Sequence, residues 1–153
     1  MNYIGSKYSL IDFLTSTITD IVGTNANNRI FADLFAGTGI VGSTFKEKGF
    51  NVISNDIQYY SYVLNRHLIG NNPPIVTKYL DYLNDLKGIE GFIYNNYCAG
   101  SGSERNYFTD TNGKKCDAIR IELEKLKMNG NINENEYYYL LASLINSIDK
   151  YAN

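Results

Sequence analysis

Two acidic residues and three glycines in the first third of the chain have the types and spacing of a cofactor site. Asp33 is followed by glycines at positions 37, 39 and 42, and Asp56 lies about 20 residues beyond the first of these glycines. Glycine has no Cβ, so a glycine-rich turn lets the backbone approach a ligand closely and adopt positive φ angles. A carboxylate such as Asp56 can accept hydrogen bonds from ribose hydroxyls. These residues predict a site for an adenosine-type cofactor.

The same three glycines spell the G-x-G-x-x-G motif of dinucleotide-binding proteins, so NAD(P) is one alternative. Asp33 stands four residues before the loop, where its carboxylate would repel a pyrophosphate. S-adenosylmethionine (SAM) has no phosphate, and its ammonium and sulfonium groups would be attracted by that carboxylate. Charge therefore favours SAM, while NAD(P) and a tight turn that binds no ligand remain as alternatives.

The spacing of apolar residues predicts the helices and strands that must position this loop. Five segments alternate between helical and extended patterns: a helix over Leu10–Val22, a buried strand over Ile30–Phe35, a helix over Ile40–Lys48, a strand over Asn51–Ser54 and a helix over Ile57–Ile69. Strands that alternate with helices predict an α/β fold with a parallel sheet. Residues 1–74 therefore read as the first units of such a sheet, with the loop at the carboxyl ends of its strands.

The pattern changes after the Gly70–Pro74 break, and residues 75–153 predict a mainly helical region attached to the unfinished sheet. We expect a helix over Ile75–Leu86, an extended segment over Gly91–Cys98, a polar loop over Ala99–Gly113 and a helix over Lys115–Met128. The last helix has a capping-box start, because Asn133 is followed three residues later by Glu136. The three tyrosines at 137–139 lie beside a leucine stripe, which favours core packing over a stacking platform.

Composition excludes several classes of protein. The net charge of −2 gives no electrostatic case for nucleic acid, and the cluster of Lys114, Lys115 and Arg120 is surrounded by acidic residues. No apolar run has the length of a membrane helix, and no secretory signal is visible at the start, so we expect a cytoplasmic protein. The two cysteines lack metal-ligand spacing and predict reduced thiols. His67 has no second histidine partner, so we expect a helix-end residue and no metal.

Three motifs in the first 57 residues resemble those of the Dam-type (D12 class) DNA adenine-N6 methyltransferases. Asp33–Gly39 resembles the D-x-F-x-G-x-G motif of that family, Tyr3–Lys7 its aromatic-x-G-x-K motif, and Ser54–Ile57 its second cofactor motif. The second half also resembles the family, at Gly91–Cys98, Arg105–Thr109 and Tyr137–Leu144. The resemblance thus runs along the whole chain, and it implies a partial Rossmann-like methyltransferase sheet with a helical target-recognition subdomain.

The resemblance also implies roles for individual residues. The residues expected to contact SAM are Tyr3, Lys7, Asp33, Phe35, Gly37, Gly39 and Asp56. Lys7 suits the methionine carboxylate, Asp56 the ribose, and Tyr3 the sulfonium or the adenine ring. A solvated lysine, a turn or cap carboxylate and a core aromatic are the respective structural alternatives.

The family also needs a D/N-P-P-Y/F motif, which holds the target amino group and stacks on the flipped base. The only candidate is Asn72-Pro73-Pro74-Ile75, and we reject it because Ile75 has no ring and the segment lies too soon after Asp56. We therefore expect no catalytic motif in this chain. A methyltransferase split into two polypeptides, a truncated gene and a fragment of a longer protein would each explain this, and in each case the chain alone should not methylate DNA.

In the Dam-type order, the segment before the catalytic motif recognises double-stranded DNA, which here is Lys78–Asn153. The expected contacts lie between Tyr97 and Lys115 and are Arg105, Asn106, Tyr107, Lys114 and Lys115. Arginine and asparagine can read base edges, and lysines can meet phosphates. The expected function is the SAM-binding and DNA-recognition portion of a restriction–modification methyltransferase. An ordinary solvated loop, and a fragment that binds DNA or a second subunit without catalysis, remain as alternatives.

Overall fold

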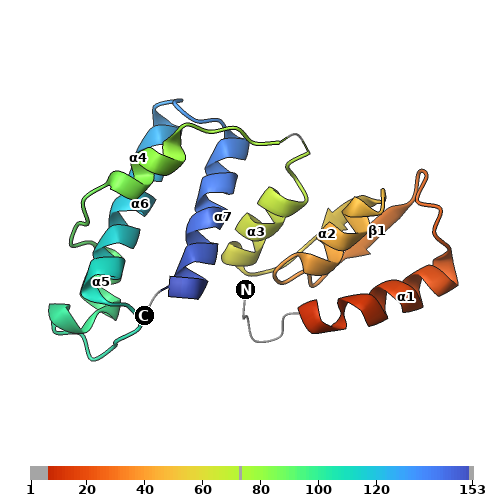
Figure 1. Ribbon diagram of the computed structural model, residues 1–153, viewed down its shortest axis with the longest axis horizontal. Coiled ribbons are helices and arrows are strands. Elements are labelled where there is room, and N and C mark those ends of the chain that lie inside the picture. Colours follow the sequence, from red (N-terminus) through yellow and green to blue (C-terminus); the bar gives the residue numbers. More distant parts are fainter. Residues whose placement is uncertain (1–6, 73, 152–153) are drawn as a thin grey trace. The chain divides into compact units, whose positions relative to one another are not determined.

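The computed structural model describes residues 7–72 and 74–151 and divides into two compact units, residues 1–73 and residues 74–153 (Figure 1). None of the described helices combines the length and apolar character that a membrane span requires.

The first unit contains the predicted alternation of helices and strands. Its elements are the short 3-10 helix η1 (Tyr8–Leu10), α1 (Ile11–Val22), β1 (Ile30–Asp33), α2 (Ile40–Glu47), β2 (Asn51–Ser54) and α3 (Tyr59–Leu68). The two strands are parallel, with Ile30 opposite Asn51 and Asp33 opposite Ser54. The carboxyl ends of both strands therefore lie side by side. The glycine loop follows β1 at this edge of the sheet, and Asp56 follows β2 at the same edge.

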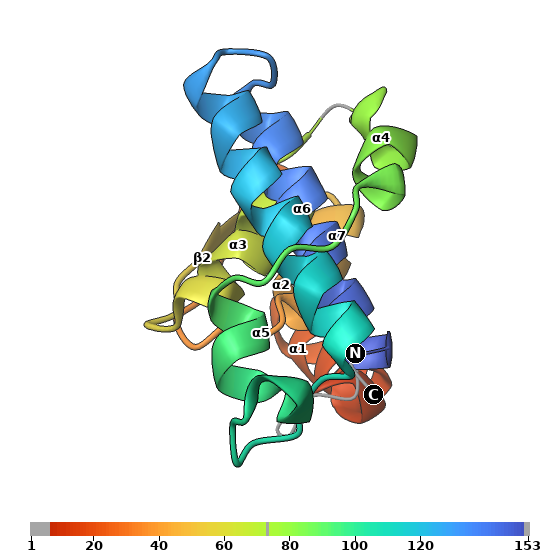
Figure 2. The ribbon, with the colours of Figure 1, turned by 90° about the vertical axis from the view of Figure 1, so that its left-hand side faces the viewer.

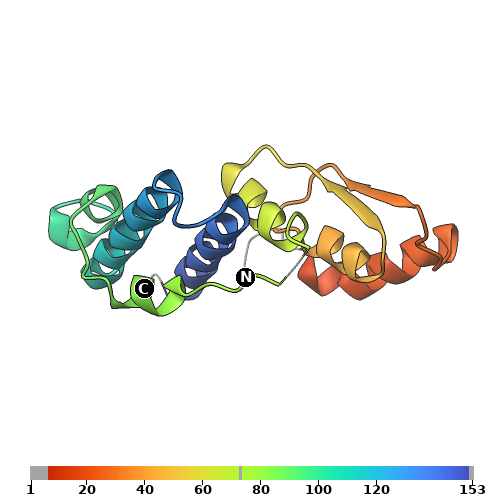
Figure 3. The same cartoon turned by 90° about the horizontal axis from the view of Figure 1, so that it is seen from above.

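Helices α1 and α2 lie on one face of this sheet (Figure 3). A small aromatic core joins them to the strands. The ring of Phe45 in α2 stacks on Phe31 of β1 at 4.1 Å and meets Phe50 edge-on at 5.4 Å. The partly buried residues of α1 that pack against this cluster are Ile11, Leu14 and Ile18. Helix α1 thus uses the apolar stripe that the sequence predicts, and both α1 and α2 cover the same side of the strands.

The opposite face of the sheet is exposed, so the prediction of a buried strand over Ile30–Phe35 is wrong in two respects. The strand ends at Asp33, and the side chain of Ile30 is 66% exposed. On the same face of the sheet, Ile53 of β2, which lies opposite Ala32, is 55% exposed. The apolar composition of β1 is that of a strand covered on both faces, whereas the described helices of this unit cover only one.

The second unit is mainly helical, and its two long helices pack against each other (Figure 2). Its elements are α4 (Tyr79–Asp85), α5 (Phe92–Tyr97), the 3-10 helix η2 (Ala99–Ser101), α6 (Asp110–Met128) and α7 (Glu134–Tyr151). The capping box is confirmed, because the Glu136 N–H donates to Asn133 Oδ1 at 3.0 Å and the Asn133 N–H donates to Glu136 Oε2 at 3.1 Å. Tyr137 and Tyr138 are buried, which confirms their assignment to the core.

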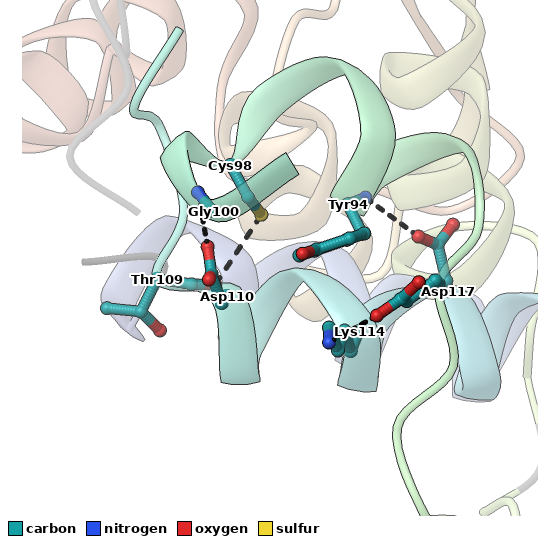
Figure 4. Close-up of polar contacts among 8 residues, drawn as sticks. Tyr94, Cys98, Gly100, Thr109, Asp110, Lys114 and Asp117 are labelled. Atoms are coloured by element: carbon teal, nitrogen blue, oxygen red, sulfur yellow. Dashed lines mark hydrogen bonds and ion pairs between the residues drawn. The ribbon is translucent and has the colours of Figure 1, made fainter. Parts of the chain in front are cut away.

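The prediction of an extended segment over Gly91–Cys98 is wrong, because the structure has helix α5 there. The carboxylate of Asp117, fully buried in α6, accepts the backbone N–H group of Tyr94 at 2.8 Å (Figure 4). It also accepts the N–H group of Ile93 at 3.0 Å. A helix N-terminus needs acceptors for its first N–H groups. Here the acceptor comes from 23 residues further along the chain, so no local pattern could reveal it.

Helix boundaries in this unit also differ from the predicted ones. Helix α6 begins at Asp110 rather than at Lys115, because Thr109 Oγ1 caps it by accepting the Asn112 N–H at 3.2 Å. Helix α4 begins at Tyr79, four residues after the predicted start at Ile75. The loop predicted over Ala99–Gly113 is thus shorter, and its start is taken by η2.

Candidate cofactor site and nucleic-acid interface

The loop between β1 and α2 has the backbone that its glycines predict. Gly37 and Gly39 both have positive φ angles, 54° and 81°, and Gly39 precedes the first residue of α2. A Cβ at Gly39 would lie 2.9 Å from Oδ1 of Asn65, a side chain of α3. The loop therefore needs glycine at this position for two reasons: the positive φ angle and the close contact of its backbone with α3.

Asp56 closes the loop from the end of β2. Its Oδ2 accepts the Gly37 N–H at 2.8 Å, and its Oδ1 accepts the Gln58 N–H at 2.9 Å. The hydrogen bonds from Gln58 and Gly37 hold the pKa of the Asp56 carboxyl below its ordinary value. The carboxylate is thus ionised, and each oxygen keeps a further lone pair that can accept a ligand hydroxyl.

The predicted residues at the end of β1 lie around the same loop. Asp33 Oδ1 lies 3.4 Å from the Phe35 N–H, and Asp33 Oδ2 is buried with no hydrogen-bond partner among the described residues. The ammonium of Lys7 donates to the Phe35 carbonyl at 3.2 Å. The side chains of Phe35 and Ile57, which flank the loop, are 82% and 95% exposed. The structure thus brings Lys7, Asp33, Phe35, Gly37, Gly39 and Asp56 to one edge, while Tyr3 lies outside the described residues.

Sequence reasoning missed Asn65, which lies beneath the loop. It is 6% exposed, and its Nδ2 donates to the Gly37 carbonyl at 3.0 Å and to the Ser61 carbonyl at 2.8 Å. The available signal was a polar pair, Ser61 and Asn65, one helical turn apart within an apolar helix face. Asn65 and Asp56 also line a pocket of about 320 Å³ beside the end of β2.

In the second unit, the loop after η2 carries three of the expected DNA contacts. The side chains of Arg105, Asn106 and Tyr107 are exposed. The Arg105 guanidinium lies 5.4 Å from the ring centre of Tyr97, a cation–π contact. The Tyr97 carbonyl accepts the N–H groups of Tyr107 at 3.0 Å and Phe108 at 3.2 Å. The loop is thus held against the end of α5, and its three side chains face solvent.

The two lysines of the expected set are engaged within the protein. Lys114 pairs with Glu90 at 2.7 Å and lies 4.3 Å from the Tyr94 ring centre. The hydrogen bond to Glu90 raises the pKa of Lys114 above its ordinary value. The Lys115 ammonium donates to the carbonyls of Asn84 and Leu86 at the end of α4, a position where a cation complements the helix dipole. These lysines tie neighbouring segments to α6, unlike the three loop residues.

Comparison with known proteins identifies the family. Residues 3–153 match the model of the D12 class N6 adenine-specific DNA methyltransferases. The chain belongs to this family. The resemblance inferred from Tyr3–Lys7, Asp33–Gly39 and Ser54–Ile57 is thereby confirmed.

Several type II methyltransferases are similar to this D12-class chain. It is 52% identical over 155 residues to the type II methyltransferase M.NlaIII of Neisseria lactamica, a match that covers 100% of the chain and 46% of the relative. It is 40% identical over 160 residues to the type II methyltransferase M.FokI of Planomicrobium okeanokoites, covering 97% of the chain and 24% of the relative. It is 35% identical over 157 residues to the type II methyltransferase M.CviAII of Paramecium bursaria Chlorella virus 1, covering 100% of the chain and 46% of the relative. The D12-class chain therefore spans less than half the length of these relatives. No solved structure gives a significant match.

The remaining predictions for this D12-class chain concern His67, the cysteines and the Asn72–Ile75 segment. His67 lies in the last turn of α3, as expected, and partial burial lowers the pKa of its imidazole. Cys98 and Cys116 are both free thiols, as expected, and both are buried. In the described part of the chain, no group of three or more His, Cys, Asp or Glu side chains could hold a metal ion. Pro73 lies outside the described residues, so the rejection of Asn72-Pro73-Pro74-Ile75 as a catalytic motif stays a prediction.

Proposed function

We propose that this chain is the SAM-binding and DNA-recognition portion of a site-specific DNA adenine-N6 methyltransferase of the restriction–modification type. The observation that carries the proposal is the ionised Asp56 carboxylate, bonded to the Gly37 N–H at the carboxyl ends of two parallel strands. In a D12-class chain, an acidic residue beside a glycine loop at this edge is suited to hold the ribose of an adenosine-type cofactor. SAM supplies the methyl group in such a reaction.

The residues around the loop fit SAM chemically. Asp33 offers a buried carboxylate oxygen without a partner in the described residues, which a cationic ammonium or sulfonium would satisfy. Lys7 offers an ammonium for the methionine carboxylate, and Phe35 and Ile57 offer exposed apolar surface for the adenosine. A dinucleotide fits less well, because Asp33 would repel its pyrophosphate. Tyr3 stays in the proposed set on the family resemblance alone.

The bare face of the sheet supports the view that catalysis needs further chain. Parallel sheets are covered on both faces in proteins, and a two-stranded sheet is marginal alone. Ile30 and Ile53 are exposed on a face that no described helix of this unit covers. We propose that β1 and β2 are the first strands of a larger Rossmann-like sheet, completed by a segment or a second polypeptide that carries the D-P-P-Y motif. The 46% coverage of M.NlaIII is consistent with this view.

For the DNA contact, we propose the loop that carries Arg105, Asn106 and Tyr107. Arg105 can read a guanine edge or bind a phosphate, and Tyr97 limits its conformations before DNA arrives. Lys114 and Lys115 remain in the proposed set, but with smaller contributions, because DNA would have to displace their bonds to Glu90 and to the end of α4. The partner is double-stranded DNA, and a cytoplasmic location stays a prediction.

Calorimetric titration with SAM tests the proposed cofactor. The unmodified chain should bind SAM, and Asp56→Ala should weaken binding by about 10- to 100-fold, because a hydrogen bond to a charged group contributes about 1.5–3 kcal/mol. Asp12→Asn, an exposed carboxylate of α1, is the matched control and should bind as the unmodified chain does. No heat from a chain shown to be folded, or preferential binding of NADH, would refute the SAM assignment.

A complementation assay tests the proposed reaction. The chain alone should not transfer methyl groups from tritiated SAM to DNA. Activity should appear when it is mixed with a polypeptide that supplies the missing portion and its D-P-P-Y motif. Methylation by the chain alone would contradict the proposed division of labour. Binding of DNA without activity in any mixture would instead favour a non-catalytic module.

A further inference from the structure

The side chain of Asn65 contacts the loop between β1 and α2, residues 34–39, which we call the cofactor loop. The orientation of its amide follows from its hydrogen-bond partners. Both hydrogen bonds of its Nδ2 end on carbonyl oxygens, those of Gly37 at 3.0 Å and Ser61 at 2.8 Å. A flipped amide would place its oxygen against both carbonyls, so the donor must face them. The side chain reaches from α3 across 28 positions of sequence to the loop.

The result is a peptide unit held from two elements. The Gly37 N–H donates to Asp56 at 2.8 Å, and the Gly37 carbonyl accepts from Asn65. Gly39 then rests on the same Asn65 amide, where a Cβ would meet Oδ1 at 2.9 Å. Two side chains after β2 thereby determine where the backbone of the β1–α2 loop lies.

The position of Asn65 lowers the stability of the fold in a way that core packing alone does not explain. Asn65 Oδ1 is buried and has no hydrogen-bond partner among the described residues. A buried acceptor without a partner destabilises a fold, and an asparagine inside a helix is unfavourable as well. Local costs of this kind are expected where a residue serves a site rather than the core.

We propose that Asn65 is a positioning residue for the cofactor loop: it fixes the Gly37–Gly39 backbone against Asp56 and thereby sets the affinity for SAM, without itself contacting the cofactor. This inference rests on the proposed SAM site. It assigns a role to a residue outside the three motifs that identify the family. The same clamp fixes the direction in which the Asp56 carboxylate faces, since Asp56 and Asn65 hold opposite ends of one residue.

Two variants remove the donor in different ways. Asn65→Asp keeps the shape but replaces Nδ2 by an oxygen that repels the Gly37 carbonyl, and Asn65→Ala removes the amide entirely. Phe50→Leu, in the aromatic core of the same unit, is the control for a loss of stability that leaves the loop contacts in place. Agreement between the two Asn65 variants separates loss of the donor from the added charge of the aspartate.

Isotope labelling gives a readout that does not depend on the cofactor. The sequence contains two Gly-Thr pairs, Gly23-Thr24 and Gly37-Thr38. Carbonyl-¹³C glycine with ¹⁵N threonine therefore yields two cross-peaks in a carbonyl–nitrogen correlation spectrum. The Gly37-Thr38 peak should shift in both Asn65 variants, whereas the Gly23-Thr24 peak, at the end of α1, should not.

Calorimetry on the same samples completes the test. We expect SAM to bind at least about tenfold more weakly to both Asn65 variants, while Phe50→Leu retains its affinity at a comparable loss of melting temperature. An unmoved Gly37-Thr38 peak, or unchanged SAM affinity in either variant, would overturn the positioning role. Should the unmodified chain fail to bind SAM, the proposed function fails instead, and the unmodified titration tells the two outcomes apart. If one Asn65 variant does not fold, the other decides.

Discussion

Replacement of Asp117 by asparagine should destabilise the helical unit far more than an ordinary neutralisation of an acidic side chain. The Asp117 carboxylate is fully buried, accepts the N–H groups of Ile93 and Tyr94 at 3.0 and 2.8 Å, and lies 3.5 Å from the Arg120 guanidinium. An asparagine keeps one acceptor oxygen but turns an amino group toward a backbone N–H. Hydrogen bonds to a buried charge contribute about 1.5–3 kcal/mol each, so we expect a loss on the order of 2–4 kcal/mol.

The consequence should reach the proposed DNA surface through α5. Once its first N–H groups lose their acceptor, α5 should fray, and Tyr97 at its other end should no longer hold the Arg105 loop. The Tyr97 carbonyl receives the Tyr107 and Phe108 N–H groups, and its ring faces Arg105. Amide hydrogen exchange should therefore quicken at Tyr94 and at Tyr107 together, and DNA binding should weaken.

Thermal unfolding followed by circular dichroism measures the loss, with a fall in the melting temperature of the helical unit on the order of 10 °C expected. Asp85→Asn, at an exposed carboxylate in α4, is the control and should change stability by no more than about 0.5 kcal/mol. A loss of less than about 1 kcal/mol for Asp117→Asn, or exchange at Tyr107 that stays slow while Tyr94 exchanges quickly, would refute this reasoning.

Three further outcomes follow from single contacts. Gly39→Ala should weaken SAM binding measured by calorimetry, because its Cβ would meet Asn65 Oδ1 at 2.9 Å. Gly23→Ala is the control: its φ of 78° and ψ of 168° strain any residue other than glycine, but its Cβ would lie in open space, so it should cost about 1–3 kcal/mol of stability and leave the SAM affinity unchanged. Equal effects of both variants on affinity would contradict this. Asn133→Ala should lower the unfolding free energy by about 1 kcal/mol in urea titrations, since the capping box is lost, and an unchanged midpoint would argue against it. Burial raises the pKa of Cys98 and raises that of Cys116 to about 11, so both thiols should resist a disulfide reagent at pH 8 until the chain unfolds; prompt labelling of the folded chain would disprove this. Because the unfolded thiols ionise at lower pH than the buried ones, their contribution to stability should fall as the pH rises from about 9 toward 11.

The site residues that the sequence could predict are those whose role is visible in local chemistry. The Gly37 and Gly39 positions follow from the need for positive φ, and Asp56 from its place after a strand. The capping box at Asn133 is also local, since its two partners are three residues apart. Helices α1 and α2 were predicted because their apolar stripes recur at helical spacing, which reflects the face that packs on the sheet.

Only the tertiary structure could decide what depends on partners far apart in the sequence. Helix α5 forms because Asp117 supplies its N-terminal acceptor across 23 positions, so its aromatic, strand-like composition misled the prediction. Lys115 satisfies the end of α4 across about 30 positions and is therefore less available to DNA than its charge suggests. Asn65 of α3 reaches the Gly37 carbonyl across 28 positions, so its contact with the glycine loop exists only in the folded unit.

By itself, the sequence thus determined the family, the glycine loop between β1 and α2 and most of the helices, because these depend on residue types at short spacing. The tertiary structure decided which polar groups pair across the chain, and that pairing separates residues free to meet a ligand from those that hold the fold. The exposure of one face of the β1–β2 sheet is also visible only in the tertiary structure. Its apolar residues encode burial, but burial requires a partner surface, and no described element of the unit provides one.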